Sequence, residues 1–95
     1  MIYKALPIEG TNFEVRPLSG RQMREVLANQ ADWDEYTRMI ELARLSVYDK
    51  NADALAWKTS TEADDQPYPL LQKAAELSLI VNGLASSAID DAKKN

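Results

Sequence analysis

Pro69 to Leu84 read PLLQKAAELSLIVNGL, and this is the most informative stretch of the chain. Its apolar residues recur at intervals of three and four, which lays one stripe along a helix that faces a core. The stripe comprises Leu70, Leu71, Ala74, Leu77, Ile80 and Val81. Pro69 suits the first turn because its missing N–H would have no intrahelical partner, and Gly83 can take the left-handed conformation that ends a helix. The sequence therefore predicts a helix over residues 69–83, with Leu84 folding back onto its last turn.

Two further helices are predicted upstream, within residues 19–48. The first opens at a capping box, in which Ser19 and Gln22 each satisfy an otherwise unpaired backbone N–H. A second capping box, of Asp32 and Glu35, opens the next helix. The apolar residues of this second helix spread over a broad face and include Tyr36, Met39, Ile40, Ala43 and Val47. Such a helix is expected at the centre of the fold, packed against the other two.

The remaining segments are predicted from their turn chemistry and alternation. Residues 1–18 should form a short β-hairpin, because Phe13 and Val15 alternate with polar residues after a turn-forming segment. Residues 49–68 are predicted to be a loop. At most one short helix is expected in it, over residues 52–58. Its acidic, polar second half has little apolar surface to offset the entropy of ordering. A last short helix is predicted over residues 87–94.

The size and composition of the chain fit one small domain. It has 95 residues with 45% apolar content. A chain of this length buries roughly 60–68% of the surface that its unfolded form exposes, so assembly into a homo-oligomer would add stability. We predict a single mainly α domain over residues 1–95, with three to four helices and a short N-terminal β-hairpin.

The charge balance disfavours nucleic-acid binding. The formal net charge is −4, the sequence pI is about 4.7, and the basic residues are scattered along the chain. A duplex binder needs several cations aligned with phosphates. The chain also lacks a leader-like N-terminus and the ~20 consecutive apolar residues of a membrane span. We predict a soluble cytoplasmic protein that contacts neither nucleic acid nor membrane.

The chain contains no cysteine and no histidine. This removes disulfides, thiolate nucleophiles, the usual zinc ligands and the imidazole general base. Glu62, Asp64 and Asp65 lie close in sequence but lack the spacing of a calcium loop, so they are interpreted as solvated loop charges. We predict no catalytic residue, no cofactor and no metal site, hence a protein that is not an enzyme.

A few residues are candidates for contact with a partner protein. Trp33 and Trp57 lie near predicted element boundaries, where a large aromatic ring either closes the edge of the core or anchors an interface. The apolar stripe of residues 69–83 is either core or a surface offered to a client, and Asn82 is either a helix cap or a recognition residue. The candidate partner-binding residues are Trp33, Trp57, Tyr68, Leu77, Val81, Asn82 and Leu84.

The order of parts at the C-terminal end resembles a known family. An apolar helix runs into Asn82-Gly83-Leu84, and a charged tail ends in Asp90-Asp91-Ala92-Lys93-Lys94-Asn95. Residues 13–21, FEVRPLSGR, are similar to the opening strand and helix start of the same family. The chain thus resembles the tail assembly chaperones of long-tailed, siphovirus-type bacteriophages.

The resemblance implies a non-enzymatic function in viral morphogenesis. Such proteins coat the tape measure protein, recruit subunits of the tail tube (the major tail protein), act in the host bacterial cytoplasm and are absent from the mature virion. Members are often also made as a longer frameshift product, and Lys93-Lys94 is compatible with a slippery codon pair.

Two other classes compete with this reading. One is a structural virion component, such as a head-tail connector or tail completion protein, which mass spectrometry would find in purified particles. The other is a small acidic inhibitor that mimics DNA, which is disfavoured because the acids are not densely clustered on one face.

Overall fold

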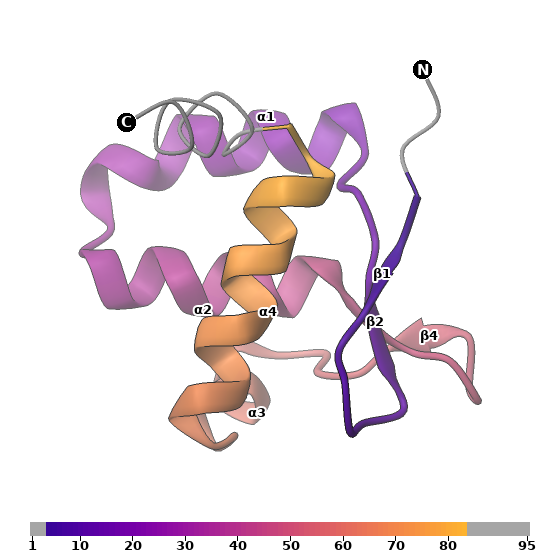
Figure 1. Cartoon of the computed structure of the whole chain (residues 1–95). Coiled ribbons are helices and arrows are strands. Elements are labelled where there is room, and N and C mark those ends of the chain that lie inside the picture. Colours follow the sequence, from indigo (N-terminus) through magenta and orange to yellow (C-terminus); the bar gives the residue numbers. More distant parts are fainter. Residues whose placement is uncertain (1–3, 84–95) are drawn as a thin grey trace, which may run out of the picture.

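The computed structural model of the chain describes residues 4–83, and Figure 1 shows the arrangement of its helices and strands. In chain order these are β1 Leu6–Pro7, β2 Phe13–Val15, α1 Gly20–Asn29, the 3₁₀ helix η1 Gln30–Asp32, α2 Glu35–Ser46, β3 Val47–Asp49, β4 Ala54–Leu55, α3 Ser60–Asp64 and α4 Tyr68–Val81. Leu84 and the helix predicted at residues 87–94 lie outside the described residues.

The strands form one antiparallel sheet in the order β1-β2-β3-β4. Val15 of β2 is the central partner, opposite Leu6 of β1 on one side and Val47 of β3 on the other. The predicted N-terminal hairpin is therefore present as β1 and β2. The prediction of a mainly α fold with only that hairpin needs correction, since β3 and β4 extend the sheet and make the domain mixed α/β.

The helices begin at local capping residues, and one of the two predicted capping boxes needs correction. Ser19 Oγ accepts a hydrogen bond from the Gln22 N–H, and Gln22 Oε1 accepts one from the Ser19 N–H, so the first capping box is confirmed. The second predicted box is wrong, because Asp32 lies in η1. α2 instead starts at Asp34, whose carboxylate accepts from the Thr37 N–H at 2.7 Å.

The segment after α2 departs most from the sequence prediction. Helix α2 ends at Ser46, and Val47 has extended backbone angles that begin β3 instead of continuing the helix. The short helix predicted over residues 52–58 is wrong, since this segment contains the end of a tight turn and then β4. Asp53 stands in that turn with φ 52°, a left-handed conformation that aspartate tolerates better than most residues.

The predicted loop of residues 59–67 contains a one-turn helix, α3. Thr59 caps it by accepting from the Glu62 N–H at 3.1 Å, and Glu62 accepts from the Lys58 N–H at 2.8 Å. Ala63 is fully buried and fixes the helix to the core. The pair Thr59 and Glu62 has the capping-box spacing, which was the overlooked signal for this helix.

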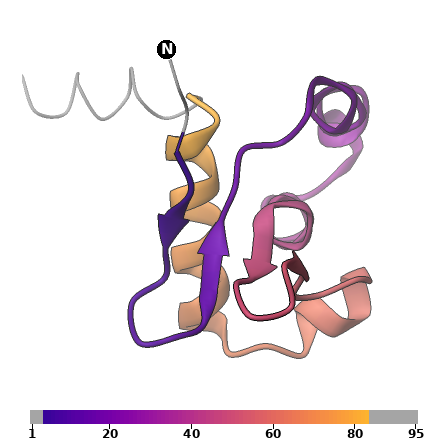
Figure 2. The same cartoon turned by 90° about the vertical axis from the view of Figure 1, so that its right-hand side faces the viewer.

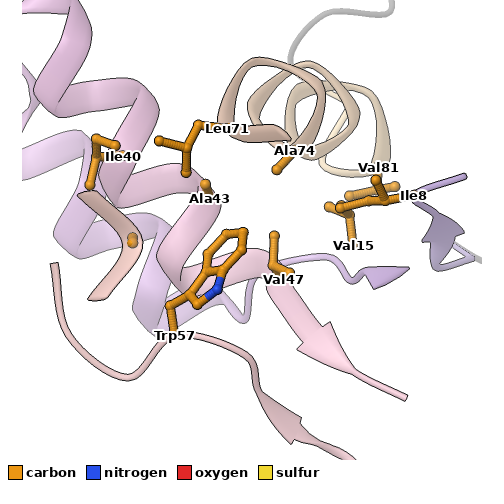
Figure 3. Packing of buried hydrophobic residues seen from close by; sticks show 10 residues of the cluster. Ile8, Val15, Ile40, Ala43, Val47, Trp57, Leu71, Ala74 and Val81 are labelled. Carbon is orange, nitrogen blue, oxygen red and sulfur yellow. The ribbon is translucent and has the colours of Figure 1, made fainter. Parts of the chain in front are cut away.

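The hydrophobic core lies where α2, α4 and the sheet meet. Figures 1 and 2 show α4 crossing α2 and lying beside the β1–β2 hairpin, and Figure 3 shows the side chains that converge there. The buried cluster comprises Ile8, Val15, Ile40, Ala43, Val47, Trp57, Ala63, Leu71, Ala74 and Val81. The prediction of a central second helix is confirmed for α2, which contacts α1, α3 and α4.

Candidate functional site

Three of the candidate partner-binding residues lie in the hydrophobic core or pack against it, namely Trp57, Val81 and Leu77. Trp57 is only 4% exposed, and its ring meets the Phe13 ring edge-on at 5.6 Å between centroids. Val81 is buried in the same cluster, and Leu77 is half-buried and packs against it. Trp57 and Val81 are therefore core residues in the structure, whereas the sequence left open whether they belong to the core or to an interface. Neither presents a surface to a partner in this fold.

Asn82 ends helix α4 and ties it to the start of α1. Its Oδ1 accepts from the Leu18 N–H at 2.7 Å, and its Nδ2 donates to the Ser78 carbonyl oxygen at 2.7 Å. Gly83 follows with φ 75°, the predicted left-handed exit. Below this cap, the hydroxyl groups of Ser78 and Ser46 share a fully buried hydrogen bond of 2.7 Å between α4 and α2. Asn82 thus has the structural role of a cap and a cross-link.

Replacing Asn82 with alanine is expected to lower the free energy of unfolding by about 1–3 kcal/mol, because the part-buried Leu18 N–H would lose its acceptor. Chemical denaturation followed by circular dichroism measures this loss. Asn29→Ala is the matched control, since within residues 4–83 the exposed Asn29 side chain bonds only the Glu25 carbonyl oxygen of its own helix. Equal losses in the two variants would contradict the cross-linking role of Asn82.

A groove of about 740 Å³ is lined by residues of α2, its N-cap and α4, and by none of the strands. Its lining residues are Asp34, Glu35, Tyr36, Arg38, Met39, Leu42, Tyr68, Gln72, Ala75 and Leu79. Leu42 and Ala75 are buried, whereas Tyr68 and Tyr36 are 53% and 44% exposed. An apolar base with two exposed phenol rings beside it is the composition typical of a protein-binding surface. We call this feature the α2–α4 groove.

Charged side chains stand at the end of the α2–α4 groove where α2 begins. The pKa of Asp34 is held below its usual range by hydrogen bonds from Thr37, because these bonds favour the carboxylate. The Glu35 carboxylate has no hydrogen-bond or ion-pair partner among residues 4–83. Arg38 donates from Nη2 to the Gln30 carbonyl oxygen at 3.2 Å. Its Nε is a buried polar atom without a hydrogen-bond partner in that part of the chain.

A second, smaller hollow of about 400 Å³ adjoins the first at Tyr36. Trp33 lines it together with Ile40 and Asp64. The Tyr36 hydroxyl donates to Asp64 Oδ1 at 2.5 Å and so joins α2 to α3, and this bond raises the pKa of Tyr36 because it favours the protonated phenol. Trp33 and Tyr68, both candidates from the sequence, are thus brought to the two sides of Tyr36.

Tyr36 is an aromatic residue of this surface that was not among the candidates from the sequence. It lies one helical turn before Ile40 on the apolar face of α2, so the spacing assigned it to the core. The sequence carries one signal against burial of Tyr36. Asp34 and Glu35 precede it at the start of the helix, where side chains are more often exposed to solvent than packed in the core.

Two further observations concern the part of the chain that the structure describes. No helix in residues 4–83 is both long and apolar enough to cross a membrane. Over the same residues, no three aspartate or glutamate side chains gather into a group that could hold a metal ion.

Comparisons of the chain with protein-family models, curated proteins and solved structures find no match. Function is therefore inferred from the residues of the α2–α4 groove and from the resemblance described above.

Proposed function

We propose that this chain is a non-enzymatic protein-binding module that serves as a tail assembly chaperone of a long-tailed bacteriophage. It acts in the host bacterial cytoplasm and holds apolar helices of a client in the α2–α4 groove. The observation that carries the proposal is the groove itself, where residues 4–83 leave two exposed tyrosines and the half-buried Met39 and Leu79 uncovered beside a separate core. The resemblance to the chaperone family supplies the client, the tape measure protein.

The shape of the groove suits a helical client. Tyr68, Gln72, Ala75 and Leu79 follow one another along α4 at intervals of four, three and four, which places them on one face. At 1.5 Å per residue this face extends about 16 Å, the length of three turns of a docked helix. Helix-in-groove binding uses anchors at the same intervals on the client. One groove therefore accommodates one short amphipathic segment.

Weak binding by many copies accounts for chaperone action on a long client. Occupied helices no longer contribute to aggregation, so each bound copy favours the soluble form by mass action. Copies along one chain also raise the local concentration of binding surfaces. In this proposal the coated tape measure protein then recruits tail tube subunits, and the chaperone leaves before the virion matures.

Binding to a purified tape measure fragment tests the proposal. Tyr68→Ala and Leu79→Ala are each expected to weaken binding by about 1–3 kcal/mol, because exposed aromatic and apolar anchors carry most of the energy of such interfaces. Leu27→Ala is the matched control, since Leu27 on α1 is 53% exposed and does not line the groove. Isothermal titration calorimetry gives the affinities, and co-expression gives the amount of soluble fragment.

The Leu27→Ala control shows whether a loss of binding is specific to the α2–α4 groove. If Leu27→Ala weakens binding as much as the groove variants do, the binding surface lies elsewhere. If the unmodified chain neither binds the fragment nor raises its solubility, the chaperone proposal fails.

A further inference from the structure

The two ends of the α2–α4 groove differ in chemistry. At one end, Tyr36 and Tyr68 both line the groove, and the Tyr36 hydroxyl is hydrogen-bonded to Asp64 of the adjoining hollow. Along α4 the lining then becomes apolar toward Leu79. A client helix therefore meets an aromatic, charged end first and a hydrocarbon lining beyond it. We call the first of these the tyrosine end.

The charges at the tyrosine end are mostly negative. Among residues 4–83, Asp34 and Glu35 line the groove with two carboxylates, and Asp64 adds a third at the Tyr36 hydroxyl, against the guanidinium of Arg38. That guanidinium donates to the Gln30 carbonyl oxygen, and the Glu35 carboxylate has no partner among the described residues. The field at this end favours a cation from outside the domain.

The same chain shows how such a set of groups holds a cation. On the sheet, the Arg16 guanidinium lies 4.3 Å from the centre of the Tyr48 ring. Glu14 and Asp53 each bind it through a charged hydrogen bond of 2.6 Å. That cluster contains an aromatic face, two carboxylates and the cation that satisfies them. The tyrosine end has the aromatic faces and the carboxylates, but no lysine or arginine of residues 4–83 lies over Tyr36 or Tyr68.

From this juxtaposition we propose that the α2–α4 groove selects a client helix that carries a lysine or arginine one turn beyond its apolar stripe. The cation lies against Tyr36 and Tyr68 with the Glu35 carboxylate, unpaired among the described residues, as a countercharge, while the apolar stripe covers Ala75 and Leu79. This inference rests on the proposed function, because it names the client segment that the groove takes. It also fixes the direction in which the client helix lies in the groove, because only the tyrosine end accepts a positive charge.

The test uses two synthetic helical peptides and the full chain. Both peptides carry the same leucines at positions i, i+3, i+4 and i+7, and they differ only in a lysine or a glutamine one turn after the last leucine. The lysine peptide is expected to bind about tenfold more tightly at low salt, the range of a cation over aromatic rings beside a carboxylate. Fluorescence anisotropy of labelled peptides measures both affinities.

Variants of the chain locate the effect. Glu35→Gln and Tyr68→Leu are each expected to reduce the preference for the lysine peptide to about twofold or less, because each removes one partner of the cation. Far-ultraviolet circular dichroism of Glu35→Gln and Tyr68→Leu shows whether both variants are folded. Glu25→Gln is the matched control, since Glu25 is an exposed carboxylate on α1 that does not line the groove. It should keep the full preference.

The outcomes separate this inference from the proposed function. Equal affinity of the two peptides overturns the cation selection and leaves the helix-binding function intact, whereas failure of both peptides to bind removes both. A preference that survives in Glu35→Gln and Tyr68→Leu places the cation elsewhere and also overturns the inference. If a peptide of residues 84–95 displaces the lysine peptide, or if binding weakens as the chain is concentrated, the occupant is the chain's own terminal segment or a second copy, and the assignment to a client fails.

Discussion

Replacing Trp57 with alanine is expected to lower the free energy of unfolding by about 3–5 kcal/mol, the largest effect of any single substitution considered for this fold. The indole is 4% exposed, sits in the main core cluster and packs edge-on against Phe13. It therefore joins the segment after β4 to the first hairpin. A small domain has about 5–15 kcal/mol of stability in total, so the variant should lose a large fraction of it and unfold at a much lower urea concentration.

Trp33→Ala is the natural control for this prediction, because Trp33 is half-buried beside the smaller hollow and lies outside the core cluster. Urea denaturation followed by far-ultraviolet circular dichroism measures both variants without relying on tryptophan fluorescence. We expect the loss in Trp33→Ala to be less than half of that in Trp57→Ala. A stable Trp57→Ala variant that had lost only its client binding would instead make Trp57 an interface residue.

The elements that could be predicted from the sequence are those whose ends are specified locally. Helix α1 begins at a hydrogen-bonded pair three residues apart, Ser19 and Gln22, and α4 has Pro69 in its first turn and Gly83 just beyond its end. Each of these signals involves only residues that are close in sequence, so the sequence pattern alone is sufficient to predict these helix ends. The same rule explains α3, which was overlooked although Thr59 and Glu62 carry a local signal.

The strands β3 and β4 could not be predicted in this way. Val47 continues the apolar spacing of α2, and its extended conformation arises from pairing with Val15, which is far away in the sequence. Such pairing depends on the tertiary fold, which overrides local preference. Once β3 is extended, the turn at Asp53 returns the chain to form β4.

The candidate site was predictable only in part, for a related reason. Trp33, Trp57 and Tyr68 have the same appearance in sequence, as aromatic residues near the ends of elements. Burial of Trp57 is decided by helices and strands from the whole chain, whereas Tyr68 stays exposed at the start of α4. Tyr36 shares the helical spacing of true core residues, so periodicity alone could not place it on the groove.

Helix α4 divides its apolar residues between two faces, and this division yields the second large prediction. Leu71 is 1% exposed within the core cluster, so Leu71→Ala is expected to lower the free energy of unfolding by about 2–5 kcal/mol through loss of contacts and the cavity left behind. Leu79 is half-buried and lines the α2–α4 groove. Leu79→Ala should therefore lose less than half as much stability but most of the affinity for a client helix.

The two alanine variants together test which face of α4 is core and which is client surface. The removed atoms are the same at both positions, so a difference between the variants reflects only where each side chain points. Chemical denaturation gives the stability of each variant, and calorimetric titration with the tape measure fragment, at a temperature where both are folded, gives the affinity. If Leu79→Ala were the more destabilised variant and Leu71→Ala the weaker binder, the assignment of the two faces would be reversed. The α2–α4 groove would then have no role in binding.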